Sequence, residues 1–197
     1  MLGKILPVLA APSTQRHLER RILRVDPSHL FDVIVDVDSY SAFLPLCTRS
    51  KVLRRSECGR QFDAVLRVGL GGGVGVTGGP LATSATALIS EEYVSRVTAD
   101  RKAGTIEANS IRSERLDGLR SAWRLRPLPA IDSAADANFE FGGNRWTDVS
   151  FEVEMTVSDP LIACTINAVL GEVAARQVEA FERRCSHLAT VERGGRR

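Results

Sequence analysis

Residues 159–188 constrain the fold of this chain more than any other stretch, because their apolar side chains recur three or four residues apart along the whole segment. Asp159 can cap the first helical turn, and Pro160 suits the first position inside it. Charged residues such as Arg176 and Arg183 fall mostly on the opposite face. The pattern predicts one long amphipathic helix that lies against a partner surface and carries too much charge to cross a bilayer. Its apolar residues are Ile162, Ile166, Val169, Leu170, Val173, Val178, Phe181, Cys185 and Leu188.

Length and charge indicate one domain with a sizeable core. The chain has 197 residues, of which 44% are hydrophobic, and its 26 basic and 24 acidic residues leave a net charge of +2. This near balance gives no electrostatic reason to expect nucleic-acid binding. We therefore predict a domain over residues 19–190, an N-terminal extension over residues 1–18 and a basic tail over residues 191–197.

The N-terminal extension contains Lys4, Arg16 and His17 but no acidic residue. This composition, together with apolar residues that could form a short amphipathic turn, resembles a mitochondrial presequence. A frayed N-terminus is the alternative. Because no apolar run of about 18 residues or more is found, we expect a soluble or peripheral protein.

The cysteines and histidines give no sign of a metal centre or a catalytic group. The cysteines are far apart and form no C-x-x-C pair, which favours free thiols over a zinc site or a disulfide framework. No histidine has a partner at metal-ligand or triad spacing. We therefore predict no catalytic and no metal-binding residue. The residues concerned are Cys47, Cys58, Cys164, Cys185, His17, His29 and His187.

The middle of the chain changes from helical to alternating spacing. Asp26-Pro27 predicts a first short helix, and Asp38-Ser39 predicts a second, which Pro45 ends. Two later strands have basic outward residues in one and acidic outward residues in the other, so we expect them to pair antiparallel through ion pairs. The predicted strands are residues 19–25, 47–55, 60–69, 82–91, 93–100, 119–125 and 147–155, with a turn at Glu91-Glu92 and an unassigned connection over residues 101–115.

This order of elements predicts an α+β fold. A curved antiparallel sheet of about seven strands would wrap around the long C-terminal helix, with two short helices after the first strand. The long helix is the element able to cover the apolar face of such a sheet. Asp63 and Glu152 fall on outward strand positions, away from that face.

Several short segments carry a more specific resemblance, in a fixed order along residues 19–188. Phe43-Leu44-Pro45-Leu46-Cys47 follows the second short helix, Leu66-Arg67-Val68-Gly69 ends a strand, and Gly171-Glu172-Val173 lies in the last helix. The chain resembles the coenzyme Q-binding START-domain proteins, which have the START-like helix-grip fold. Leu46 and Leu70 stand where that family usually has an aromatic residue. The other matching segments are Glu19-Arg20-Arg21-Ile22-Leu23, Tyr40, Thr83-Ser84, Trp123-Arg124-Leu125 and Val178-Glu179-Ala180-Phe181-Glu182-Arg183-Arg184.

The resemblance implies a tunnel for coenzyme Q (ubiquinone) between the sheet and the last helix. It therefore implies a non-enzymatic carrier or chaperone that supports respiration and quinone biosynthesis. Its expected partners are ubiquinone, a membrane surface and proteins of the respiratory chain or of quinone biosynthesis. Its expected location is the matrix side of the mitochondrial inner membrane. The residues expected to line the tunnel are Phe43, Leu44, Pro45, Leu46, Phe62, Leu66, Val68, Leu70, Trp123, Leu125, Phe151, Val153, Leu170 and Val173.

Three alternatives stay open. By spacing alone, the same residues fit an ordinary hydrophobic core. START-like folds also include polyketide cyclases, but these need acid–base groups facing the cavity, and Asp63 and Glu152 are expected to face outward. A ribosome-associated interaction module, like the related bacterial toxins, is a further alternative by family analogy.

The glycine-rich residues 69–80 are expected to form a mobile loop that gates the tunnel and contacts the membrane, or else a disordered insertion.

Overall fold

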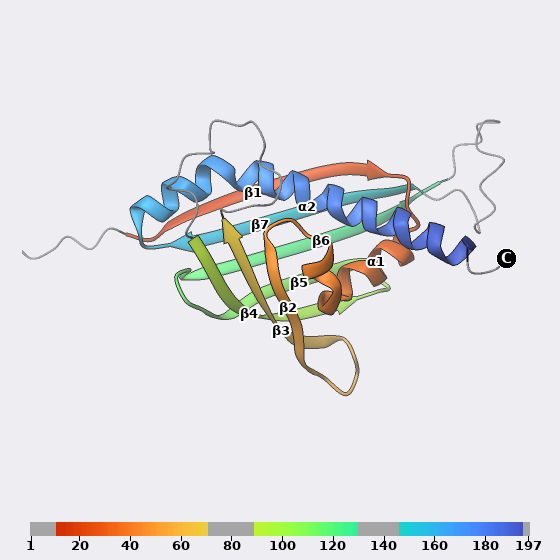
Figure 1. Cartoon of the computed structure of the whole chain (residues 1–197), viewed down its shortest axis with the longest axis horizontal. Coiled ribbons are helices and arrows are strands. Elements are labelled where there is room, and N and C mark those ends of the chain that lie inside the picture. Colours follow the sequence, from red (N-terminus) through yellow and green to blue (C-terminus); the bar gives the residue numbers. More distant parts are fainter. Residues whose placement is uncertain (1–10, 71–88, 130–145, 195–197) are drawn as a thin grey trace, which may run out of the picture.

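A seven-stranded antiparallel sheet forms the body of the molecule, and one long helix, α2, runs across one of its faces (Figure 1). The computed structural model describes residues 11–70, 89–129 and 146–194. The strand order is β1-β7-β6-β5-β4-β3-β2, with β1 and β2 at the edges. The predicted α+β fold, a curved sheet gripping the C-terminal helix, is therefore confirmed.

The elements follow one another in the predicted order. Two short helices come directly after the first strand, and the long helix comes last. The bounds are β1 Ser13–Leu23, α1 Pro27–Val35, the 3-10 helix η1 Val37–Ala42, β2 Cys47–Arg55, β3 Gln61–Leu70, β4 Ile89–Asp100, β5 Thr105–Ser113, β6 Gly118–Leu128, β7 Trp146–Val157 and α2 Pro160–Gly194.

Two of the three predicted helix starts are capped by the predicted aspartate. The third is not, because η1 begins at Val37 and Asp38 lies inside its first turn. Asp26 Oδ1 accepts hydrogen bonds from the backbone N–H groups of Ser28 and His29, at 2.8 and 3.4 Å. Asp159 Oδ1 accepts them from Leu161 and Ile162, at 2.8 and 3.1 Å. In each case the side chain satisfies donors that have no partner inside the first turn, which is why the helix begins at the following proline.

The core lies where α2 crosses the sheet. α2 contacts β1, β7 and α1, and its Phe181 is fully buried. The Phe181 ring meets the rings of Tyr40, Phe43 and Trp123 edge-on, with centroids 5.3, 5.3 and 5.1 Å away. By length and composition alone, Pro160–Val191 could cross a membrane, contrary to the expectation from its charges. Here the buried residues of this helix pack on the sheet, as in the core helix of a globular domain.

The structure corrects one prediction about the sheet and assigns one connection that the sequence left open. Glu91-Glu92 does not turn the chain, because β4 runs straight through it and pairs with β3 from Gln61↔Thr98 to Leu70↔Ile89. The unassigned connection contains a further strand, β5, which pairs with β4 and β6. Of the predicted strand over residues 82–91, residues 82–88 lie outside the described residues, and residues 89–91 belong to β4.

The ends of the domain also differ from the prediction. β1 begins at Ser13 rather than at residue 19 and pairs with β7 along its whole length. Its early part is part of the fold because α2 packs on it: a Cβ added to Gly171 of α2 would come within 3.2 Å of the ring of His17. At the other end, α2 continues to Gly194, beyond the predicted boundary at residue 190. The remaining predictions for residues 1–10, for the glycine-rich loop over residues 71–80 and for residues 130–144 lie outside the described residues.

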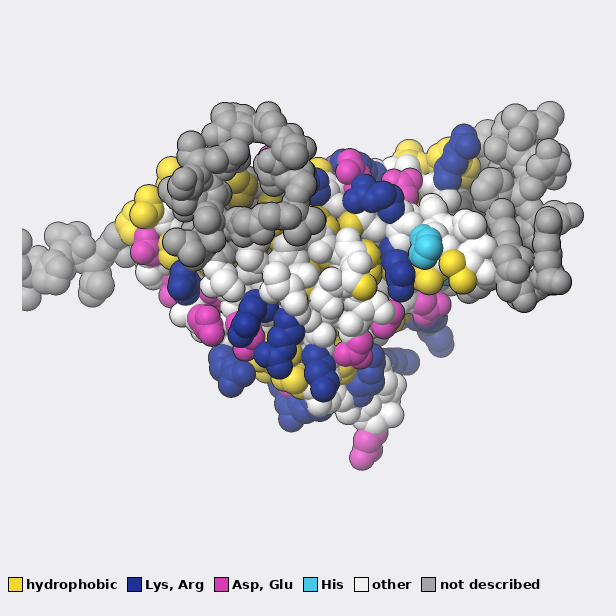
Figure 2. All heavy atoms as spheres, viewed as in Figure 1, with side chains coloured by type: hydrophobic (Ala, Val, Ile, Leu, Met, Phe, Trp, Pro, Cys, Tyr) yellow, Lys and Arg dark blue, Asp and Glu magenta, His cyan; other side chains and the backbone are white. Residues whose placement is uncertain are grey.

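The outer face of the sheet carries arginine–carboxylate pairs, as predicted for β6 and β7. Arg124 of β6 lies 3.9 Å from Glu152 of β7, which also pairs with Arg16 of β1 at 2.8 Å. Asp63 of β3 pairs with two arginines, one from each neighbouring strand. Figure 2 shows basic and acidic side chains interspersed over the end of the molecule that carries β2, β3 and β4. Asp63 and Glu152 therefore face away from the helix, as expected.

Candidate functional site

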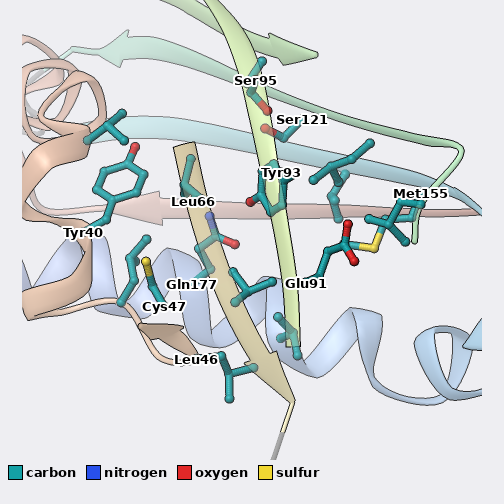
Figure 3. Close-up of a pocket in the computed structure, with 18 of the residues that line it drawn as sticks. Tyr40, Leu46, Cys47, Leu66, Glu91, Tyr93, Ser95, Ser121, Met155 and Gln177 are labelled. Carbon is teal, nitrogen blue, oxygen red and sulfur yellow. The ribbon is translucent and has the colours of Figure 1, made fainter. Parts of the chain in front are cut away.

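A cavity of about 200 Å³ lies between the inner face of the sheet and α2 (Figure 3). Side chains from η1, the segment after it, the inner face of β3 to β7 and the first half of α2 form its wall. It lies beside the first half of α2, whereas Phe181 farther along the helix is packed among the aromatic rings of the core. Toward the first turns of α2 the helix carries Ile162, Ile166 and Val173 into the wall rather than large aromatic rings.

The structure brings most of the predicted tunnel residues to this cavity. Trp123 forms part of the wall and stacks on Phe151 with a centroid distance of 4.3 Å. The cavity wall therefore includes an aromatic pair, and aromatic side chains are common in pockets that bind small apolar ligands. The predicted residues that line the cavity are Leu44, Pro45, Leu46, Leu66, Val68, Trp123, Phe151, Val153 and Val173.

The other predicted tunnel residues lie elsewhere. Phe62, Leu125 and Leu170 are buried in the core outside the cavity wall. Phe43 is partly buried and does not line the cavity. Its ring packs edge-on against Phe181 instead. Leu70 is the last residue of β3, and its side chain lies outside the described residues.

Leu46 holds a strained position at the rim of the cavity. Its φ of 66° lies in the left-handed region, which costs a non-glycine residue about 1–2 kcal/mol. The carbonyl of Leu46 accepts a hydrogen bond of 2.9 Å from the N–H of Gly69, which helps to keep this conformation. The strain turns the chain between Pro45 and β2, so that Pro45, Leu46 and Cys47 all contribute to the wall.

Polar residues also face the cavity, which corrects the expectation that the inner faces offer only apolar side chains. Glu91, Tyr93 and Ser95 alternate along β4 and share the inward face with Val97. Ser121 of β6 and Gln177 of α2 add polar groups from other sides (Figure 3). Sequence reasoning missed the β4 residues because it placed a turn at Glu91-Glu92. A strand read straight through the pair would have placed Glu91 inward.

Glu91 is the most unusual of these residues. It is only 5% exposed, and its Oε1 accepts hydrogen bonds from the N–H groups of Glu114 and Arg115, at 2.9 and 3.2 Å, and from the hydroxyl of Ser113. Its Oε2 is buried and has no hydrogen-bond partner within the part of the chain that the structure describes. A buried acceptor without a donor destabilises the folded state by about 1–3 kcal/mol. Such atoms are rare in native proteins, and they often mark functional sites.

The hydroxyl and thiol groups around the cavity are held in their protonated forms. Burial raises the pKa of Tyr40, whose hydroxyl donates to the carbonyl of Ile34, and burial likewise raises the pKa of Tyr93. Burial also raises the pKa of Cys47, whose thiol donates to the carbonyl of Arg49 at 3.4 Å. None of these groups is therefore an activated nucleophile. Within the described residues, no group of three or more His, Cys, Asp or Glu side chains could hold a metal ion.

Comparison with known proteins agrees with this architecture. The sequence profile of the family described as polyketide cyclase / dehydrase and lipid transport matches residues 23–182. The chain belongs to this family. Members with this description include both enzymes and lipid carriers, so membership alone does not choose between catalysis and binding.

Relatives and solved structures of the family cover nearly the whole chain. The chain is 24% identical to the ribosome association toxin RatA of Pseudomonas aeruginosa over 173 residues, which is 87% of this chain and 96% of that protein. Solved structures include a START superfamily protein from Mycobacterium smegmatis (TM-score 0.64, 14% identity, 88% of this chain and 98% of that one) and the Zhui aromatase/cyclase from Streptomyces sp. R1128 (0.63, 13%, 88% and 94%). The 18 kDa protein CC1736 from Caulobacter crescentus has a TM-score of 0.61 at 23% identity, over 89% of this chain and 99% of that one. At these identities the likeness shows the fold, here the START-like fold.

Proposed function

We propose that the cavity binds the ring of an isoprenoid quinone of the coenzyme Q type and that the protein carries this lipid without catalysing a reaction on it. The observation that carries the proposal is the largely apolar cavity between the sheet and α2, with the stacked pair Trp123–Phe151 in its wall. Apolar walls that include aromatic side chains suit a substituted ring, and the lipid-transport description of the family is consistent with such a ligand.

The size of the cavity decides which part of the lipid it takes. A cavity of about 150 Å³ holds one benzene molecule, so 200 Å³ suits one substituted ring but not a complete long-tailed quinone. The isoprenoid tail would then extend beyond the enclosed part, and each methylene that it buries would add about 0.8 kcal/mol to binding. A membrane surface is the natural partner for such a tail. The resemblance to the coenzyme Q-binding proteins extends the proposal to the matrix side of the mitochondrial inner membrane and to partners in respiration or quinone biosynthesis.

A second candidate function is enzymatic, and the polar wall of the cavity favours it. Cyclases need acid–base groups at the substrate, and Glu91 and Tyr93 face the cavity although Asp63 and Glu152 do not. The third candidate is association with the ribosome, which the similarity to the toxin RatA favours. Each candidate function predicts a different binding partner or product, so assays on one preparation of the protein distinguish the three.

The test combines lipid analysis with a matched pair of variants. Leu66 is partly buried and lines the cavity, whereas Leu53 on the neighbouring strand β2 is 52% exposed. The protein is purified from a quinone-producing host and its lipids are extracted for mass spectrometry. We expect isoprenoid quinone at near-stoichiometric amounts in the parent and in Leu53→Lys, and none in Leu66→Lys, because a charge in the cavity opposes an apolar ligand. Circular dichroism should be nearly the same for all three.

Other outcomes would overturn the proposal. If the parent carried no quinone but converted an aromatic polyketide, the protein would be an enzyme. If it carried no lipid and co-sedimented with ribosomes, it would be an interaction module. If Leu66→Lys retained quinone as fully as Leu53→Lys, the ligand would not occupy this cavity.

A further inference from the structure

The carboxylate of Glu91 divides its two oxygens between different tasks. Oε1 holds the turn that follows β5, because it accepts from Ser113, Glu114 and Arg115, while Ser113 in turn accepts from the N–H of Leu116 at 3.1 Å. These contacts fix the position of the side chain on the cavity wall. Oε2 takes no part in them and has no partner among the described residues. Glu91 therefore places in the cavity wall one fixed acceptor that no described residue satisfies.

Among the described residues, no lysine, arginine or histidine side chain forms an ion pair with Glu91. Arg115 also lines the cavity, and it contacts Glu91 through its backbone N–H. By contrast the next residue, Glu92, faces the outer side of the sheet and pairs with Arg67 at 2.8 Å and Arg49 at 3.3 Å. Figure 3 shows Glu91 and Met155 among the residues that line the cavity. An unpaired oxygen in this setting is completed by a ligand that brings a hydrogen-bond donor.

The chemistry of the donor discriminates between the two redox forms of a quinone. A quinone has two carbonyl oxygens, which only accept hydrogen bonds, so its oxygens would meet the lone pairs of Glu91 Oε2. A hydroquinone has two phenolic O–H groups, and an O–H that donates to a carboxylate oxygen makes a short, charge-assisted bond. The cavity wall also contains Tyr93 and Ser121, whose hydroxyls can donate or accept hydrogen bonds.

We propose that Glu91 makes this site selective for a hydroxylated ring, so that the protein binds the hydroquinone form of its ligand in preference to the quinone. The proposal rests on the proposed function for the class of ring and adds its redox state. A hydrogen bond to a charged group changes affinity by about tenfold or more. By thermodynamic linkage, a tenfold tighter binding of the reduced form raises the midpoint potential of the bound two-electron couple by about 30 mV.

The test compares decylubiquinone with decylubiquinol, prepared beforehand and kept anaerobic. Binding is measured by quenching of tryptophan fluorescence, since Trp123 lies in the cavity wall, and by calorimetry. The matched variants are Glu91→Gln and Glu92→Gln, on adjacent positions of β4 that face opposite sides of the sheet. In Glu91→Gln the amide oxygen can keep the three contacts of Oε1, and the amide N–H₂ replaces Oε2 with a donor. The fold should therefore survive, which a melting curve checks.

The expected result is a change of preference at one position only. The parent and Glu92→Gln should bind decylubiquinol at least tenfold more tightly than decylubiquinone, and Glu91→Gln should lose or invert this ratio. A parent that binds both forms equally, or the quinone more tightly, would overturn the inference and leave the proposed function intact. The same ratio in Glu91→Gln as in the parent would overturn the assignment to Glu91. No binding of either form would overturn both the inference and the proposed function.

Discussion

Truncation of Phe181 to alanine should remove the part of the core that positions α2 on the sheet. The side chain is fully buried and meets three aromatic rings edge-on, from Tyr40, Phe43 and Trp123. Replacement of a buried phenylalanine by alanine destabilises a protein by about 3–5 kcal/mol. Each lost aromatic pair adds about 0.5–1.5 kcal/mol beyond the lost buried area, so we expect the destabilisation of this variant toward the upper end of that range. In a domain of this size, 1 kcal/mol shifts the melting temperature by about 2–4 °C, so we expect a drop of about 6–20 °C.

The free energy of unfolding is measured by urea denaturation and the melting temperature by thermal denaturation, both followed by circular dichroism and tryptophan fluorescence. Val191→Ala is the control, because it removes an apolar side chain from the same helix at a position that is 57% exposed. This variant should stay within about 0.5 kcal/mol of the parent. If Phe181→Ala lost less than about 1 kcal/mol, or if the two variants lost the same amount, the helix would not be anchored by this aromatic cluster.

Two further predictions concern stability. Hydrogen bonds from Arg96, and then from Arg54, hold the pKa of Asp63 below its ordinary value. The stability that this carboxylate contributes is therefore present above a pH of about 4, and it is lost as the pH falls through the lowered pKa. In urea titrations Asp63→Asn should therefore be less stable than the parent at pH 7, with a difference that shrinks at pH 3, and a difference independent of pH would contradict this. Gly104→Ala should destabilise the protein clearly more than Gly59→Ala. Both glycines have a positive φ, which costs alanine about 1–2 kcal/mol. A Cβ at Gly104 would also lie 2.3 Å from the carbonyl oxygen of Leu125, whereas the space at Gly59 is open. Equal melting temperatures would refute the steric argument.

The elements predicted well from the sequence are those whose signals are local. The start of α1 and the start of α2 follow from an aspartate that caps a turn and a proline behind it, and both are confirmed. The pairing of β6 with β7 follows from complementary outward charges and apolar inward residues, and it is confirmed from Gly118↔Thr156 to Leu128↔Trp146. Periodicity and capping depend on residues that are close together in the sequence, so both can be recognised without knowledge of the tertiary structure.

The elements that were missed depend on partners far away in the chain. β5 has no clean alternation, since most of its residues are only partly buried or exposed on both faces. It is a strand because β4 and β6 supply hydrogen-bond partners on its two sides. The early part of β1 contains basic and polar residues, and it joins the sheet because β7 and α2 bind it. Such residues carry little propensity of their own, and tertiary contacts decide their conformation.

The polar end of the cavity shows where patterning by hydrophobicity fails for a physical reason. Inward strand positions are expected to be apolar because a filled core offers no partners for polar groups. Along β4 the inward residues change from Val97 through Ser95 and Tyr93 to Glu91. This gradient is tolerable only where space, a loop or a ligand supplies the missing partners. At Glu91 the loop after β5 supplies them for one oxygen, and the other oxygen has no partner among the described residues. We infer from this that a run of inward polar residues on a strand whose neighbours are apolar is a signal of a binding cavity, and that the unsatisfied oxygen indicates the donor that the proposed ligand would bring.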